Sequence, residues 1–90
     1  MSRHEFQHDP VRVAIGWDAP LATFYLQVWT GREADEDDGP AIWLGTAYGE
    51  APDPEPLIAI ARQHLASMPT TIGRQLRVDQ LMAPPRHRSP

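Results

Sequence analysis

The sequence predicts an α+β protein: a three-stranded antiparallel β-meander packed on an amphipathic helix, with a shorter C-terminal helix. Residues 11–30 alternate between apolar and other side chains with a period of two, which is typical of half-buried strands. Residues 54–67 repeat apolar side chains at intervals of three and four, which is typical of a helix with one buried face. We therefore expect a sheet with a helix on one side of it.

The first two strands are predicted at 11–17 and 21–30, joined by a turn at Asp18, Ala19 and Pro20. An Asp side chain bonds the backbone that follows it, and Pro fixes φ and cannot donate to a strand partner, so both residues favour a turn. One side of each strand is purely apolar and is expected to form the core. These core residues are Val13, Ile15, Trp17, Phe24, Leu26 and Val28.

A third strand is predicted at 41–46, and the first helix starts where Asp53 caps free backbone N–H groups ahead of Pro54. Residues 71–82 are interpreted as a second helix, because helix formers outnumber β-branched residues; a strand is the alternative. Pro69 separates the two helices.

Three segments lack an apolar pattern and are expected to lie outside the core. Residues 1–9 are predicted to be a flexible arm, and 84–90 a disordered basic tail. Residues 31–40 hold five carboxylates around one Arg and are predicted to be a solvated loop. Residues 10–83, including this loop, are expected to form a single domain, which suits a chain of 90 residues.

The composition excludes several classes of function. The chain has no Cys and no Lys, so it offers no thiolate site, no Schiff base and no P-loop lysine. No secretory signal and no membrane span are predicted, and we expect a cytoplasmic protein that binds no membrane. The net charge of −4 divides into −8 over residues 1–56 and +4 over 57–90, which suggests complementary surfaces. The all-Arg basic set, with many Pro and Ala, indicates a GC-rich bacterial genome.

The segments GWDAPLATFYLQVW, WLGTA and QLRVDQLM occur in this order. In these segments the chain resembles a family of short uncharacterised bacterial proteins that share a GWD-x-PL-x-TF core with a nearby WLG. The resemblance covers most of residues 11–82. It implies similar element boundaries, and it implies no known activity.

Catalysis, cofactors and metals are not expected. Asp18 beside Trp17 and His64 on the apolar side of the first helix are the sharpest candidates for acid–base chemistry, but a turn cap and a core histidine are the commoner roles. His4 and His8 would face one metal only if residues 1–9 were helical. We therefore predict no catalytic residue, no cofactor and no metal ligand.

The second side of the sheet is predicted to be exposed and to bind a protein partner or a second copy of the chain, as a small non-catalytic interaction module. The alternative arrangements are that the second helix covers this side or that it is a homodimer seam. The predicted partner-binding residues are Thr23, Tyr25, Gln27, Trp29 and Trp43. The predicted charged docking residues are Asp35, Glu36, Asp37, Asp38, Arg74 and Arg77. An alternative function is a nucleic-acid-associated regulator that uses the C-terminal arginines, although the acidic pI of 5.4 argues against it.

Overall fold

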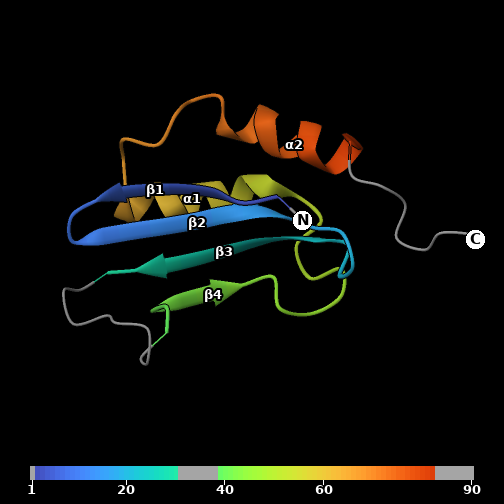
Figure 1. Cartoon of the computed structure of the whole chain (residues 1–90), viewed down its shortest axis with the longest axis horizontal. Helices are drawn as coiled ribbons and strands as arrows, with labels where there is room; N and C mark the ends of the chain where they lie inside the picture. The colour runs from blue at the N-terminus through green and yellow to red at the C-terminus, as the bar shows by residue number, and fades with distance from the viewer. Residues whose placement is uncertain (1, 31–38, 83–90) are drawn as a thin grey trace, which may run out of the picture.

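The structure, a computed structural model, describes residues 2–30 and 39–82, and it is an α+β fold with an open antiparallel sheet and two helices (Figure 1). The elements are β1 (His4–His8), β2 (Val11–Asp18), β3 (Thr23–Trp29), β4 (Ile42–Leu44), α1 (Pro54–His64) and α2 (Ile72–Met82). The predicted α+β class with an antiparallel sheet and two helices is confirmed, but the sheet has four strands where three were predicted. The C-terminal helix was predicted to be the shorter one, and it has the same length as α1, 11 residues. Neither described helix is long and apolar enough to cross a membrane.

The order of the strands in the sheet is the order of the strands in the chain, β1-β2-β3-β4, and each neighbouring pair is antiparallel. The register of β2 and β3 places the predicted core side chains opposite each other. The three core pairs are Val13 with Val28, Ile15 with Leu26, and Trp17 with Phe24. The rings of the last pair meet edge to face, with their centroids 4.8 Å apart.

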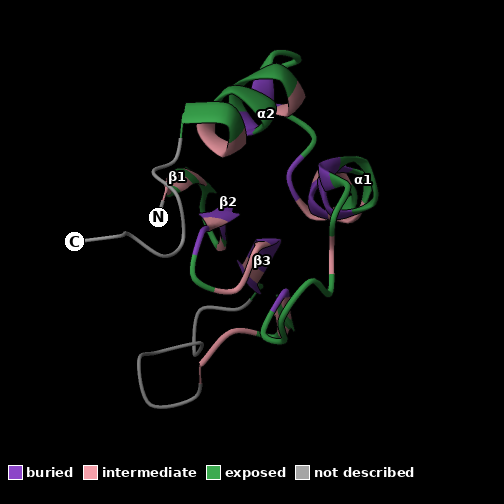
Figure 2. Cartoon of the chain, turned by 90° about the vertical axis from the view of Figure 1, so that its right-hand side faces the viewer, coloured by how far each residue is buried: buried purple, intermediate pink, exposed green. Residues whose placement is uncertain are grey.

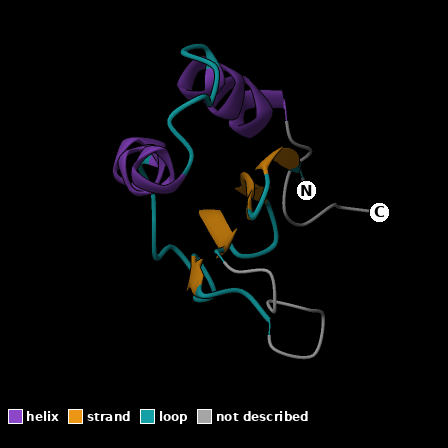
Figure 3. Ribbon diagram, turned by 90° about the vertical axis from the view of Figure 1, so that its left-hand side faces the viewer, coloured by secondary structure: helices purple, strands orange, loops and turns teal. Residues whose placement is uncertain are grey.

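Both helices lie on this apolar side of the sheet, as Figures 2 and 3 show from opposite ends. Helix α1 packs against β3, and α2 packs against β2. The buried residues Ile72 and Leu76 of α2 join the same core as Leu57, Ile58 and Ala61 of α1. The second helix therefore does not cover the aromatic side of the sheet, and a sandwiched core is not what the structure shows.

Helix α1 begins as the sequence predicts and ends earlier. The Asp53 carboxylate accepts a hydrogen bond from the Glu55 N–H at 3.1 Å, and Pro54 occupies the first turn. The helix ends at His64, three residues before the predicted end. The Arg62 guanidinium donates to the backbone oxygens of Met68 and Pro69 and so holds the chain in the turn that follows.

The prediction of a flexible arm at residues 1–9 is wrong, because β1 occupies His4–His8. Phe6 lies opposite Val13 and packs against the core. On the same side, the His4 Nε2 lies 2.6 Å from Asp79 Oδ2 of α2. The strand is thus held both by β2 and by a side chain from the far end of the chain.

The last segment is helical, as favoured, with α2 spanning Ile72–Met82. Most of the predicted acidic loop, including Asp35, Glu36, Asp37 and Asp38, lies outside the described residues, and so does the predicted basic tail at 84–90.

Candidate binding face

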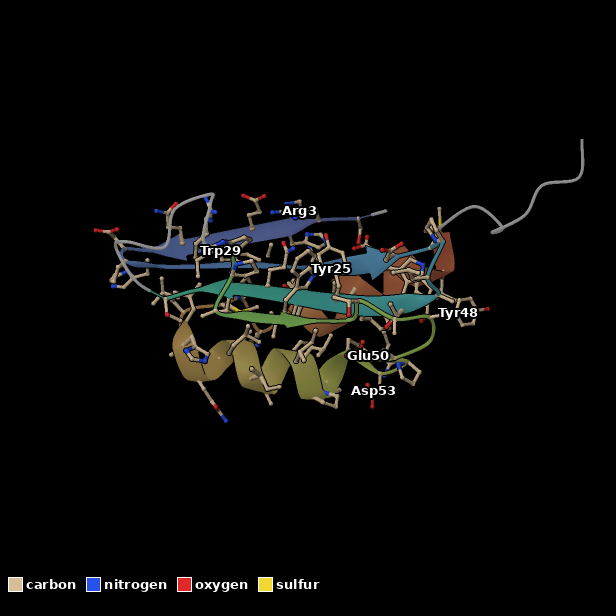
Figure 4. All side chains as sticks on the ribbon, turned by 90° about the horizontal axis from the view of Figure 1, so that it is seen from below. Arg3, Tyr25, Trp29, Tyr48, Glu50 and Asp53 are labelled. Atoms are coloured by element: carbon tan, nitrogen blue, oxygen red, sulfur yellow. The ribbon has the colours of Figure 1, made fainter. Side chains whose placement is uncertain are left out.

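The side of the sheet turned away from α1 and α2 is called the open face here. Arg3, Tyr25 and Trp29 point to this side in Figure 4, away from α1. The residues on the strands of this face are Glu5, Gln7, Arg12, Ala14, Gly16, Asp18, Thr23, Tyr25, Gln27, Trp29 and Trp43. No helix of the described chain covers the open face, so it is the natural place to look for a binding site.

The five predicted partner-binding residues differ widely in exposure. Thr23 and Tyr25 are buried, with 0% and 6% of their surface exposed. Gln27 and Trp29 are half-buried. Trp43 is 57% exposed. The expectation that all five are exposed is therefore wrong for Thr23 and Tyr25, and Trp43 is the most accessible of the five.

Thr23 has a structural role at the start of β3. Its hydroxyl accepts a hydrogen bond from the Ala51 N–H at 2.7 Å and donates to the Phe24 carbonyl at 2.9 Å. The Ala51 carbonyl in turn accepts from the Phe24 N–H at 3.0 Å. These bonds attach the segment that leads into α1 to the end of β3, and they use the Thr23 hydroxyl within the chain.

Tyr25 is covered by Ser2, the first residue that the structure describes. The Tyr25 hydroxyl donates to the Ser2 carbonyl at 2.6 Å, and the Ser2 N–H donates to the Trp17 carbonyl at 2.9 Å. Gly16 makes this approach possible, because a Cβ at that position would lie only 2.8 Å from the Tyr25 hydroxyl oxygen. Tyr25 therefore forms the floor of the open face and holds Ser2 against it.

A hollow of about 210 Å³ lies above Tyr25, at the end of the open face nearest the turn between β2 and β3. Its lining residues are Arg3, Asp18, Leu21, Tyr25, Gln27, Trp43, Gly45 and Thr46. Arg3 crosses the sheet to donate to the Gln27 side-chain oxygen at 3.3 Å, so the wall opposite Trp43 is polar. The hollow combines one exposed indole, one guanidinium and one amide on a floor that is hydrogen-bonded in place.

The charge of Arg3, which directly precedes β1, is partly balanced by Glu5 of that strand. The Arg3 guanidinium forms an ion pair with the Glu5 carboxylate, which raises the pKa of Arg3 and lowers the pKa of Glu5. Both side chains are about half exposed, so the pair is screened by water. Further along the same face, the Arg12 guanidinium lies 4.3 Å from the centre of the Trp29 ring, so Trp29 already has a cationic partner within the chain.

The structure does not bring the predicted arginines to the open face. Arg74 and Arg77 lie on α2, on the other side of the sheet. Arg77 donates to the Asp53 carboxylate at 3.0 Å, and Arg74 lines a separate hollow with His4 and Asp79. The aromatic residues and the C-terminal arginines thus belong to different surfaces.

The residues considered for catalysis and metal binding, Asp18, His64, His4 and His8, occupy ordinary places in turns, helix ends and strands. The Asp18 carboxylate accepts from the Leu21 N–H at 3.4 Å across the turn, which is the capping role of an Asp at this place. His64 ends α1. His4 and His8 sit at the two ends of a strand, about 13 Å apart at roughly 3.3 Å per residue. Within residues 2–30 and 39–82, no group of three ligating side chains is arranged for a metal ion.

Comparisons with protein-family models, with curated proteins and with solved structures find no match to this chain. The resemblance to the bacterial GWD-x-PL-x-TF family stays a prediction.

Ser2 and Arg3 were not among the predicted site residues. Ser2 covers Tyr25, the floor of the hollow, and Arg3 forms its polar wall. They lie in a segment with no apolar periodicity, and only the pairing of β1 with β2 brings them over Gly16 and Tyr25. No pattern within the segment itself carries that information.

Tyr25→Phe is expected to remove a pH dependence of stability. Burial raises the pKa of the Tyr25 phenol above its ordinary value of 10.0. The unfolded chain therefore releases this proton at a lower pH than the folded chain, and stability falls as the pH rises from about 10 through the folded-state value. Urea titrations of both proteins between pH 8 and pH 11 would measure this. Parallel curves for wild type and Tyr25→Phe over that range would contradict it.

Proposed function

We propose that this protein is a small non-catalytic binding module that holds a protein partner in the hollow of the open face. The observation that carries the proposal is Trp43, whose indole is 57% exposed at the rim of the hollow. Tryptophan in a pocket with polar neighbours is the residue type that most often dominates the energy of a protein interface. Trp43 is therefore the anchor of the proposed site.

The rest of the hollow suits the recognition of a side chain or a short peptide. Its floor, Tyr25, is already satisfied by Ser2 and need not move when a ligand binds. Arg3 and Gln27 present hydrogen-bonding groups opposite the indole. An apolar surface with a few fixed polar groups gives affinity through burial and specificity through the polar contacts.

The charges favour this function over binding of nucleic acid through the C-terminal arginines. Arg77 is neutralised by Asp53, and the chain as a whole carries a charge of −4. Binding to nucleic acid depends mainly on cations that meet phosphates, so both features weigh against it.

Trp43→Ala is expected to weaken peptide binding by at least about thirtyfold, which corresponds to roughly 2 kcal/mol for the loss of an anchoring residue. The ligands are peptides selected from a displayed random library on the wild-type protein. Their affinities are measured by calorimetry for wild type, Trp43→Ala and the control Leu81→Ala.

Leu81 is a matched control because it is 81% exposed and lies on α2, away from the hollow. Its replacement should leave the affinities unchanged. The assignment of the site would be contradicted if Trp43→Ala and Leu81→Ala weakened peptide binding equally, or if neither variant weakened it. Circular dichroism spectra of both variants show whether the fold is intact.

A further inference from the structure

The two outer strands of the sheet differ in chemistry. Four of the five residues of β1 are polar, and His4 of this strand binds α2. The stretch 39–49, which contains β4, has no charged residue at all. Exposed edge strands are normally protected by charged side chains, because their free N–H and C=O groups can pair with another strand. β1 carries such side chains, whereas β4 carries none and is limited only by its length of three residues.

The backbone of β4 presents hydrogen-bonding groups to the outside. On β3, the Val28 carbonyl accepts from the Ala41 N–H at 2.7 Å, so the polar groups of Val28 point toward β4. Backbone groups of successive strand residues point to opposite sides. Ile42, which is opposite Val28, and Leu44 therefore face β3, and the N–H and C=O of Trp43 point away from the sheet. No described strand pairs with them.

We infer that β4 pairs antiparallel with β4 of a second copy of this chain, with the two Trp43 residues opposite each other on a twofold axis. The outward N–H and C=O of Trp43 then bond the same groups of the second copy. This register also places Ile42 opposite Leu44 of the other copy, and the reverse. A closed dimer with one continuous sheet results.

Both sides of the sheet have an apolar surface that suits this arrangement. On the open face, the two exposed indoles of Trp43 meet across the axis. On the helix side, a hollow of about 280 Å³ runs between β4 and α1. Leu44, Leu57 and Ile60 are the large apolar residues of its lining, which also includes Glu50 and Asp53. Ile42 of the second copy would enter this hollow beside Leu44. One pairing therefore covers the exposed indole, the free edge and the apolar hollow.

The edge pairing and the proposed function share the Trp43 indole, so a second copy and a peptide compete for it. The pairing otherwise uses the backbone of β4 and the hollow beside α1, whereas the proposed partner lies over Tyr25. A strand pairing of this length gives a small interface, and small interfaces associate weakly. We therefore expect a monomer–dimer equilibrium over about 10 µM to 1 mM, with a dimer mass twice the 10.1 kDa of one chain.

Single cysteines test the register directly, because the chain has none of its own. Residues opposite each other on the axis have Cα atoms about 5.5 Å apart, which a disulfide can bridge. Trp43→Cys is expected to give about tenfold more disulfide-linked dimer under mild oxidation than Ala41→Cys, whose copies would be about 14 Å apart. Ala59→Cys, on the exposed side of α1, controls for chance collision.

Analytical ultracentrifugation gives the second measurement. Wild type should shift toward the dimer mass with concentration, and Trp43→Lys, which places two like charges on the axis, should stay monomeric. If Trp43→Lys does not fold, the disulfide yields decide. Equal yields at positions 41 and 43, or a wild type that stays monomeric up to about 1 mM, would overturn the pairing. A monomer that still binds the selected peptides would overturn it and leave the proposed function intact.

Discussion

Phe24→Ala is expected to lower the free energy of unfolding by about 3–5 kcal/mol, the usual cost of removing a buried aromatic ring. Phe24 is 0% exposed and packs edge to face against Trp17. It lies opposite Trp17 in the register of β2 and β3, in the same core as Leu57 of α1. The cavity would therefore open where sheet and helix meet.

Urea denaturation followed by circular dichroism measures this loss. The control Leu81→Ala removes an apolar side chain that is 81% exposed and should change stability by less than about 0.5 kcal/mol. A loss below about 1 kcal/mol for Phe24→Ala would mean that the ring is not part of the folded core.

Gly45→Ala is expected to have the second largest effect, about 2–4 kcal/mol of lost stability. Gly45 has φ +81°, which an alanine adopts only with strain. A Cβ there would also lie 2.7 Å from the Tyr25 Cα and would collide with the Phe24 carbonyl oxygen. Backbone atoms cannot give way as a flexible side chain does, so the chain after β4 must move off β3.

Gly49→Ala separates the strain from the collision. Gly49 also has a positive φ, +64°, but a Cβ there would meet no atom within 4 Å. We expect it to cost only the conformational strain, about 1–2 kcal/mol. Equal losses for the two variants, measured by urea denaturation, would show that the contact of Gly45 with β3 is unimportant. Gly45 lines the hollow, so its variant should also weaken peptide binding, and Gly49→Ala should not.

The sheet between β2 and β3 was predictable because periodicity and register agree. A shift of one residue would turn Val13 and Ile15 to the open face, so the alternation excludes such shifts, and the short turn between the strands selects the pairing with Val28 and Leu26. The start of α1 was predictable for a similar reason, since Asp53 and Pro54 act on their immediate neighbours. The structure of both places is decided by features that the sequence shows directly: a side-chain pattern that repeats along β2 and β3, and a contact between near neighbours at the start of α1.

The errors lie where distant segments meet. β1 has one core residue, Phe6, and its order depends on β2 and on Asp79 of α2. Tyr25 was expected to be exposed because its face was identified correctly but its cover, Ser2, was not. The exposure of Trp43 was predicted correctly. In the structure it follows from the position of β4 as the last strand of the sheet, beyond which no other described strand lies.

The bonds of Ser2 have a practical consequence for work with this protein. Ser2 lies against Tyr25 and Trp17, and the next residue, Arg3, forms a wall of the hollow. A purification tag or fused domain joined ahead of Ser2 therefore starts one residue from Arg3, which lines the proposed site. A tag of the same length behind residue 82 starts from α2, on the other side of the sheet. We therefore expect the second design to disturb a binding assay less than the first.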